Sequence, residues 1–275
     1  MKAKKASVIL MCSLILLLLG VGCAGGNDAS SEQGTTGQES TLNTIVREGV
    51  VRVGILPDFI PWSSLNTSGG FEGYDVDIAI ELGEALGVKT ELIAVDAPNR
   101  VASLVSGKVD VVIACITPTN ERAKSIAFSI PYASEGQMAM VKKDSGLKTF
   151  DQLKGKKIAL VRGGTPDLNA TPLFTDSTIL RFDSIADAYM AFKSDKADVL
   201  IENNNFIYSE IKKSPELYMV CGEPFSKGLI SIAVKQGEQV WLNYINNFVT
   251  NIRFDGTNSE LFEKWFKTRP ASLEL

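Results

Sequence analysis

Residues 103–122 read SLVSGKVDVVIACITPTNER, and this stretch decides the fold class. Its first residues end a short helical pattern. The apolar run that follows is typical of a strand buried on both faces of a sheet. That run gives way at once to Thr117, Pro118, Thr119 and then Arg122. The order of helix, buried strand and polar strand end is typical of parallel sheets covered by helices.

The same alternation continues on both sides of this stretch and predicts an α/β fold with helices on both faces of parallel-rich sheets. The other expected strands are 51–56, 90–95, 157–162, 177–182 and 197–202. The expected helices are 74–87, 99–107, 184–195, 204–213, 238–254 and 259–266. For the first of these helices, Gly87 is the expected C-terminal stop.

Two extended apolar segments, 138–143 and 229–235, divide this series. Because only helices follow the second segment, we predict two lobes joined by two hinge crossings, with the second lobe inserted into the first. A single larger α/β domain is the alternative. We predict a signal peptide at 1–22 and a flexible tether at 23–41. The first lobe is predicted at 42–136 and 230–275, and the second lobe at 137–229.

The N-terminus has the composition of an export signal. Three lysines precede an apolar core that is shorter than the roughly 20 residues of a membrane-spanning helix. Small residues then lead to Cys23, which suggests a lipoprotein signal with Cys23 acylated. Gly20 departs from the usual lipoprotein pattern, so ordinary cleavage and secretion is the alternative. Residues 24–41 contain no aromatic or large aliphatic side chain, which predicts a flexible tether.

Composition excludes several classes of function. The chain has no histidine, which excludes histidine-based catalytic triads and nearly all zinc sites. Its net charge is −4, and without the three signal lysines 25 basic residues face 32 acidic ones, giving −7. Nucleic acid is therefore a poor partner. Beyond the signal only Cys115 and Cys221 remain; we assign them to different lobes and expect no disulfide between them.

The polar strand end after Ile116 is the strongest candidate for a ligand site, because ligands of open α/β sheets bind beyond the carboxyl ends of strands. Arg122 has a planar fork of donors that matches a carboxylate, and Thr117 and Thr119 add hydroxyl groups. The alternative is structural: the threonines cap a short helix and Arg122 is a surface residue.

Several motifs together resemble the polar amino acid family (family 3) of extracellular solute-binding proteins, the receptors of ABC importers. GYDVDIA, SGKVDVV, TPTNER and FSIPY occur in the family's order, and the resemblance spans residues 45–269. It implies a two-lobe, type II periplasmic-binding-protein-like fold with the ligand between the lobes. It also implies an amino acid ligand, an ABC permease as partner, a monomer and no cofactor or metal.

The resemblance also implies roles for individual residues. Arg122 and Thr117 correspond to the α-carboxylate clamp, and Cys115 lies where the family often has glycine or serine. The remaining positions are an aromatic cover with a neighbour and a turn in the second lobe that closes on the carboxylate, namely Phe59, Trp62, Gly164 and Thr165. For both aromatics, packing in the core is the alternative.

Two positions bear on the ligand's side chain. Arg100 matches an arginine of relatives that take acidic side chains, so aspartate or glutamate is weakly favoured. A solvated arginine on a helix face is the alternative. Relatives that bind basic ligands can have an acid at position 56, where this chain has Leu56, and this argues weakly against lysine, arginine or histidine as the ligand.

One position departs from the family. The aspartate that usually holds the ligand's ammonium corresponds here to Asn203, which offers no charge. The neighbouring Glu202 is expected to point to the other side of the strand. The ligand is then held more weakly, or another acid substitutes, or the ligand is not a standard α-amino acid.

These observations predict a substrate-binding lipoprotein of an amino acid importer, anchored outside the cytoplasm on a Gram-positive surface or in a periplasm. One alternative is an enzyme on the same fold, similar to cyclohexadienyl dehydratases, for which Glu202 is the nearby candidate acid. The other is a ligand-sensing subunit of a separate receptor.

Overall fold

The computed structural model describes residues 39–270. The predicted signal peptide, Cys23 and nearly all of the predicted tether lie outside the described residues. Within 39–270, no helix has both the length and the apolar character needed to cross a membrane.

The described chain alternates helices and strands almost throughout. The helices are α1 (Thr41–Glu48), α2 (Tyr74–Leu86), α3 (Arg100–Val105), α4 (Thr165–Ala170), α5 (Ile185–Lys193), α6 (Asn204–Lys213), α7 (Gln239–Phe254) and α8 (Thr257–Phe266). The strands are β1 (Val50–Ile55), β2 (Asp58–Phe59), β3 (Ser63–Leu65), β4 (Phe71–Glu72), β5 (Lys89–Ala94), β6 (Val111–Ile116), β7 (Ile126–Lys142), β8 (Lys157–Val161), β9 (Thr178–Phe182), β10 (Val199–Asn203) and β11 (Tyr218–Lys235). Short 3₁₀ turns lie at Arg122–Lys124, Lys143–Ser145 and Phe150–Leu153.

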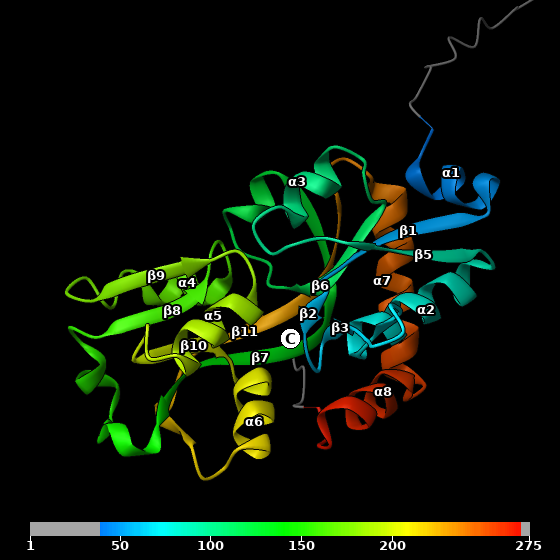
Figure 1. Cartoon of the computed structure of the whole chain (residues 1–275). Coiled ribbons are helices and arrows are strands. Elements are labelled where there is room, and N and C mark those ends of the chain that lie inside the picture. The colour runs from blue at the N-terminus through cyan, green and yellow to red at the C-terminus, as the bar shows by residue number, and fades with distance from the viewer. Residues whose placement is uncertain (1–38, 271–275) are drawn as a thin grey trace, which may run out of the picture. The chain divides into compact units, whose positions relative to one another are not determined.

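One eight-stranded sheet carries the fold, in the order β5-β1-β6-β11-β7-β10-β8-β9. We call β5, β1 and β6 the first half of the sheet and β10, β8 and β9 the second half. Pairing is parallel within each half. The long strands β7 and β11 pair antiparallel with each other and join the two halves (Figure 1). The predicted α/β class with two crossings is confirmed, and β7 and β11 are those crossings.

Helices cover each half of the sheet, and buried apolar side chains fill the space between. In the first half, α2 packs against β1, β5 and β6, and α3 packs against β1 and β6. In the second half, α5 packs against β8, β9 and β10. A large apolar cluster runs through both halves, and a smaller one, which includes Leu153 and Phe174, lies in the second half. These layers hold the strand ends in fixed positions.

The ends of α2 show why this helix begins and ends where it does. Gly73 precedes the helix with φ 136°. A Cβ atom on this residue would lie 2.4 Å from the carbonyl oxygen of Trp62, so only glycine fits. At the other end, Gly87 adopts the left-handed conformation and its N–H returns to the last turn. The predicted C-terminal stop is confirmed.

Two features were not predicted from the sequence. Helix α1 begins at Thr41, one residue before the predicted lobe boundary, after an N-cap in which Ser40 accepts from Asn43. A three-stranded sheet of β2, β3 and β4 lies beside the main sheet, with strands of only two or three residues that show no periodicity. The exact lobe boundaries predicted above stay a prediction.

Candidate functional site

A pocket of about 600 Å³, counting its open mouth, lies where strands from both halves of the sheet end. Leu56 follows β1, Cys115 lies in β6, and Glu202 lies in β10. The carboxyl ends of strands from both halves of the sheet therefore lie at this pocket, which is where open α/β sheets bind ligands.

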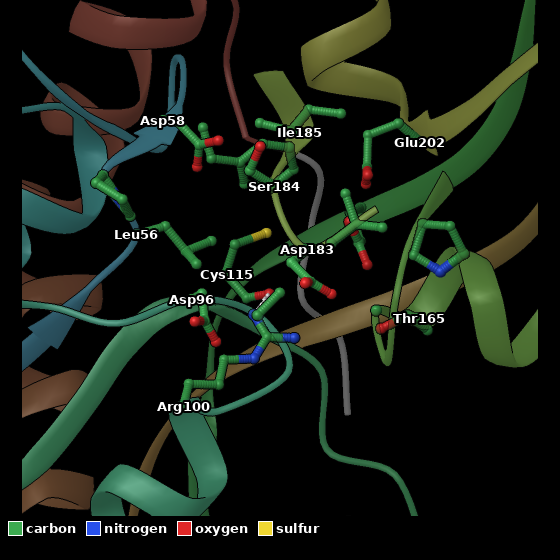
Figure 2. Close-up of a pocket in the computed structure, with 17 residues that line it drawn as sticks. Leu56, Asp58, Asp96, Arg100, Cys115, Thr165, Asp183, Ser184, Ile185 and Glu202 are labelled. Atoms are coloured by element: carbon green, nitrogen blue, oxygen red, sulfur yellow. Dashed lines mark hydrogen bonds between the residues drawn. The ribbon is translucent and has the colours of Figure 1, made fainter. Parts of the chain in front are cut away.

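Five of the predicted site residues line the pocket, and Figure 2 labels three of them: Arg100, Cys115 and Thr165. The other two are Phe59 and Gly164. Phe59 is 7% exposed and stacks on Phe206 of α6 at 5.8 Å between ring centroids. The pocket thus brings together an aromatic ring, a guanidinium group and a turn of backbone amides.

Arg100 is a buried side chain of the pocket and not a solvated arginine on a helix face. It is 3% exposed, and its Nη1 donates to the carbonyl oxygens of Ala114 at 2.7 Å and Cys115 at 3.3 Å. Burial lowers the pKa of Arg100. Its Nε has no partner among the described residues. The guanidinium therefore faces the pocket with hydrogen-bonding capacity to spare.

Arg122 does not line this pocket but bridges the two halves of the structure. Its Nη1 donates to the carbonyl oxygen of Thr117 at 2.8 Å, and its Nη2 donates to that of Gly163 at 2.9 Å. Thr119 Oγ1 accepts from the Arg122 N–H at 3.2 Å, at the first residue of a 3₁₀ turn. Arg122 is half-buried rather than a surface residue. Burial lowers its pKa to about 9, and the charge of Arg100 acts in the same direction.

A second bridge is built from hydroxyl groups. Thr165 Oγ1 donates to Thr117 Oγ1 at 3.0 Å, and Thr117 Oγ1 donates to Glu135 Oε1 at 3.2 Å. Both threonines are 7% exposed. Thr117 is outside the pocket lining, whereas Thr165 and its N-cap residue Gly164 lie within it. The predicted carboxylate-binding residues are therefore gathered in one place and contact one another across the two halves.

Glu202, and not Asn203, faces the pocket. Asn203 is fully buried; its Oδ1 accepts from Phe206 N–H at the start of α6, and its Nδ2 lies 3.5 Å from Cys115 Sγ. Glu202 lines the pocket and is 4% exposed. The expectation that Glu202 points away from the ligand side is wrong: Glu202 lines the pocket, and Asn203, the last residue of β10, caps α6 with its side chain. Burial raises the pKa of Glu202 to about 8, and the neighbouring Glu135 acts in the same direction.

Trp62 lies in the core and is absent from the pocket lining. It is fully buried, and its ring packs edge-on against Tyr74 and Phe266 with centroid distances of 5.7 and 5.1 Å. Its Nε1 has no hydrogen-bond partner among the described residues. This is the packing role that was the alternative for this residue.

Trp62→Phe is expected to lower the free energy of unfolding by no more than about 2 kcal/mol, since it loses packing but also removes an unpaired N–H. Ligand affinity should stay within about twofold, because the ring lies away from the pocket. Phe59→Leu, the matched change in the pocket, should weaken binding by about three- to tenfold. Urea unfolding and calorimetric titration of both variants test this pair. A larger affinity loss in Trp62→Phe than in Phe59→Leu would contradict it.

Four acidic residues of the pocket were missed by sequence reasoning: Asp58, Asp96, Glu135 and Asp183. Asp58 sits beside the predicted Phe59, and Asp96 follows the expected strand 90–95, so the strand-end rule could have indicated both. Glu135 lies inside a long strand and Asp183 just before α5, where no sequence signal singles them out.

Asp75 holds the backbone of Cys115, one of the residues that line the pocket. It is fully buried, and its two oxygens accept from the Cys115 N–H and the Tyr132 hydroxyl, each at 2.7 Å. Cys115 has φ 42°, a conformation that a non-glycine residue holds only when its surroundings impose it. Burial raises the pKa of Asp75 to about 7.

Comparison with known proteins gives consistent results. The pattern of the family described as "Bacterial extracellular solute-binding proteins, family 3" matches residues 51–268. The ABC transporter glutamine-binding protein GlnH of Bacillus subtilis is 31% identical over 98% of this chain and 99% of its own. The L-cystine-binding protein TcyJ of Escherichia coli is 30% identical over 83% and 86%. The crystal structure of a mutant of ArgBP from T. maritima superposes with a TM-score of 0.78 at 31% identity, covering 83% of this chain and all of that one.

Proposed function

This chain belongs to family 3 of the bacterial extracellular solute-binding proteins, and from this membership we propose that it captures a polar amino acid in the pocket described above and delivers it to an ABC permease in the membrane. Its relatives GlnH and TcyJ are binding proteins, so the chain is a solute-binding protein and not an enzyme. The observation that carries the proposal is the pocket itself, which draws its lining from both halves of the sheet.

The α-carboxylate of the amino acid is assigned to the place where Arg122, Thr117 and Thr165 meet. Arg122 reaches the Gly163 carbonyl at 2.9 Å, so its guanidinium lies beside the amides of Gly164 and Thr165. A carboxylate inserted here would accept from the guanidinium fork, the threonine hydroxyls and these amides. Opening and closing about β7 and β11 would admit and enclose the ligand.

The pocket lining bears on the side chain of the ligand. Arg100, whose guanidinium lines the pocket, was the reason to expect a ligand with an acidic side chain. Five carboxyl groups line the same pocket, however, against the single guanidinium of Arg100. We therefore propose a polar amino acid without the acidic preference.

The site of action is proposed from the N-terminal sequence. The signal-like segment ending at Cys23 supports export and attachment of the chain to a membrane through lipid on that cysteine. The composition of 24–38 supports a tether that lets the monomeric binding unit reach the permease.

Calorimetric titration of residues 24–275 with the twenty amino acids tests the function. The protein should first be unfolded and refolded to remove any bound ligand. We expect saturable binding of at least one amino acid at micromolar or lower Kd, which corresponds to about −8 kcal/mol. No binding of any amino acid would contradict the proposal, and so would turnover of prephenate, included as the substrate of the enzyme alternative.

A further inference from the structure

We propose that Asp58 holds the two halves of the structure together beside the pocket, by accepting hydrogen bonds from the first turn of α5. Asp58 is then a positioning residue, because it acts on the closed arrangement of the halves and not on the ligand itself. The inference rests on the proposed function, since a bond that keeps the halves closed affects binding only in a protein that encloses its ligand.

The bond joins two segments that are far apart in the sequence. Asp58 lies in β2, which follows β1 of the first half, whereas α5 packs against β8, β9 and β10 of the second half. Oδ2 of Asp58 accepts from the Ala186 N–H at 3.3 Å. Figure 2 shows the Asp58 carboxyl group next to Ser184 and Ile185, where α5 begins, and all three residues line the pocket.

The start of α5 lacks acceptors within its own half. A helix leaves its first N–H groups without partners in the helix. The N-cap residue Ser184 pairs with the third and fourth of these groups through its hydroxyl and carbonyl oxygens, at 3.1 and 3.2 Å. The first two groups belong to Ile185 and Ala186, and in the described part of the chain Asp58 is the acceptor found for Ala186. The first half therefore supplies an acceptor that the second half needs.

A neighbouring contact reinforces this bond. Phe59, the residue after Asp58, stacks on Phe206 of α6 with 5.8 Å between ring centroids. Strand β2 thus contacts two helices of the second half, one through a carboxyl group and one through an aromatic ring. Opening about β7 and β11 would separate β2 from both helices and return the Asp58 carboxyl group to water.

The acceptor oxygens of Asp58, and not its negative charge, stabilise the closed arrangement. Burial raises the pKa of Asp58, the N–H groups of Ala186 and Ile185 oppose this shift, and the charge of Asp187 adds to it. The charge of Asp58 in turn raises the pKa of Glu202. The other charged groups of the pocket lining are Asp96, Arg100, Glu135 and Asp183. Because the pKa of Asp58 is higher in the closed form than in water, closing takes up protons and becomes more favourable as pH falls.

The first test is calorimetric titration of wild type, Asp58→Ala and Asp58→Asn with the twenty amino acids. Asp58→Ala should weaken the binding of every amino acid that binds by a similar factor, about three- to tenfold, because it acts on closing. Asp58→Asn keeps an acceptor oxygen and loses the charge. It should bind at least as tightly as wild type, and any advantage should shrink as pH falls toward about 5.

Glu72→Ala is the matched control for these variants. Glu72 is an exposed carboxyl residue of β4, in the same three-stranded sheet as Asp58, and it lies outside the pocket lining. Its removal should leave affinity unchanged at every pH. Thermal unfolding of each variant should show that the fold is retained.

Ala186→Pro removes the same bond from the other side. Proline is tolerated in the first turn of a helix, and Pro166 already occupies the corresponding second position of α4. Since Asp58→Ala and Ala186→Pro delete one shared interaction, the double variant should bind within about twofold of the weaker single variant. Stopped-flow measurements should place the loss of affinity in a faster dissociation rate, because the complex reopens more readily.

The outcomes separate this inference from the function on which it rests. A loss in Asp58→Ala that differs by more than about tenfold between amino acids would mean that Asp58 contacts the ligand. That result, equal losses in Asp58→Asn and Asp58→Ala, or additive losses in the double variant would overturn the bond between the halves and leave the amino acid receptor intact. Failure of every amino acid to bind to wild type would overturn the proposed function instead.

Discussion

Arg122→Ala is expected to weaken amino acid binding by about 100-fold or more, because truncating one partner of a buried, charge-assisted hydrogen-bonded pair costs roughly 2–5 kcal/mol. The substitution removes the proposed carboxylate clamp and also the bonds to the carbonyl oxygens of Thr117 and Gly163. The bond to Gly163 joins the two halves, so its loss adds to that of the clamp. Calorimetric titration with the best ligand of the amino acid panel measures the effect.

Two further variants sharpen this prediction. Arg122→Lys keeps the charge but loses the planar fork, so it should recover only part of the affinity. Arg47→Ala removes an exposed arginine of α1 that pairs with Glu39 and Glu48, and it should leave affinity unchanged. If Arg122→Ala binds normally while Arg100→Ala does not, the α-carboxylate lies on Arg100 and the assignment to Arg122 is wrong.

Asp75→Ala is expected to lower the free energy of unfolding by about 2–5 kcal/mol, because it leaves two buried donors without acceptors at roughly 1–3 kcal/mol each. These donors are the Cys115 N–H and the Tyr132 hydroxyl, each 2.7 Å from the carboxyl group. Urea unfolding followed by circular dichroism measures the loss. A loss below about 1 kcal/mol would show that water or a shifted backbone replaces both bonds.

Asp75→Asn keeps an acceptor oxygen and tests the protonation state separately. The folded pKa of about 7 lies above the ordinary value of 3.8 because the group is buried. The folded wild type therefore binds more protons than the unfolded chain, and the stability from this group is present at low pH and lost as pH rises through 7. Asp75→Asn lacks this dependence, so its stability relative to wild type should improve from pH 5 to pH 8. A constant difference over this range would contradict the raised pKa.

Some residues of the candidate site could be predicted from the sequence and others could not. The side chains of Phe59 and Arg100, which the resemblance to the family singled out, both line the pocket, and their roles in ligand binding stay predictions. Trp62 was predicted beside the ligand but packs in the core, because no sequence pattern separates a cleft aromatic from a core aromatic three residues after Phe59. Its packing partners, Tyr74 and Phe266, come from distant parts of the chain.

Glu202 and Asn203 illustrate a second limit. The family's pattern placed Asn203 toward the ligand, and alternation along the strand then placed Glu202 away from it. In the structure the strand stops at Asn203, which turns to cap α6. The two neighbours still alternate, but Glu202 and not Asn203 lines the pocket, because the Asn203 side chain is used to cap α6.

The sequence by itself determined the α/β class, the two crossings and the strand-end location of the site, because hydrophobic periodicity and the positions of glycine and polar residues are local properties that follow from backbone geometry. Only the tertiary structure decided the electrostatic character of the pocket. Glu135 and Glu202, from strands far apart in the chain, line one cavity together with Arg100, and all three side chains are largely buried there. Charge balance and pKa depend on distances and burial in three dimensions, and neither is encoded in the spacing of residues along the chain.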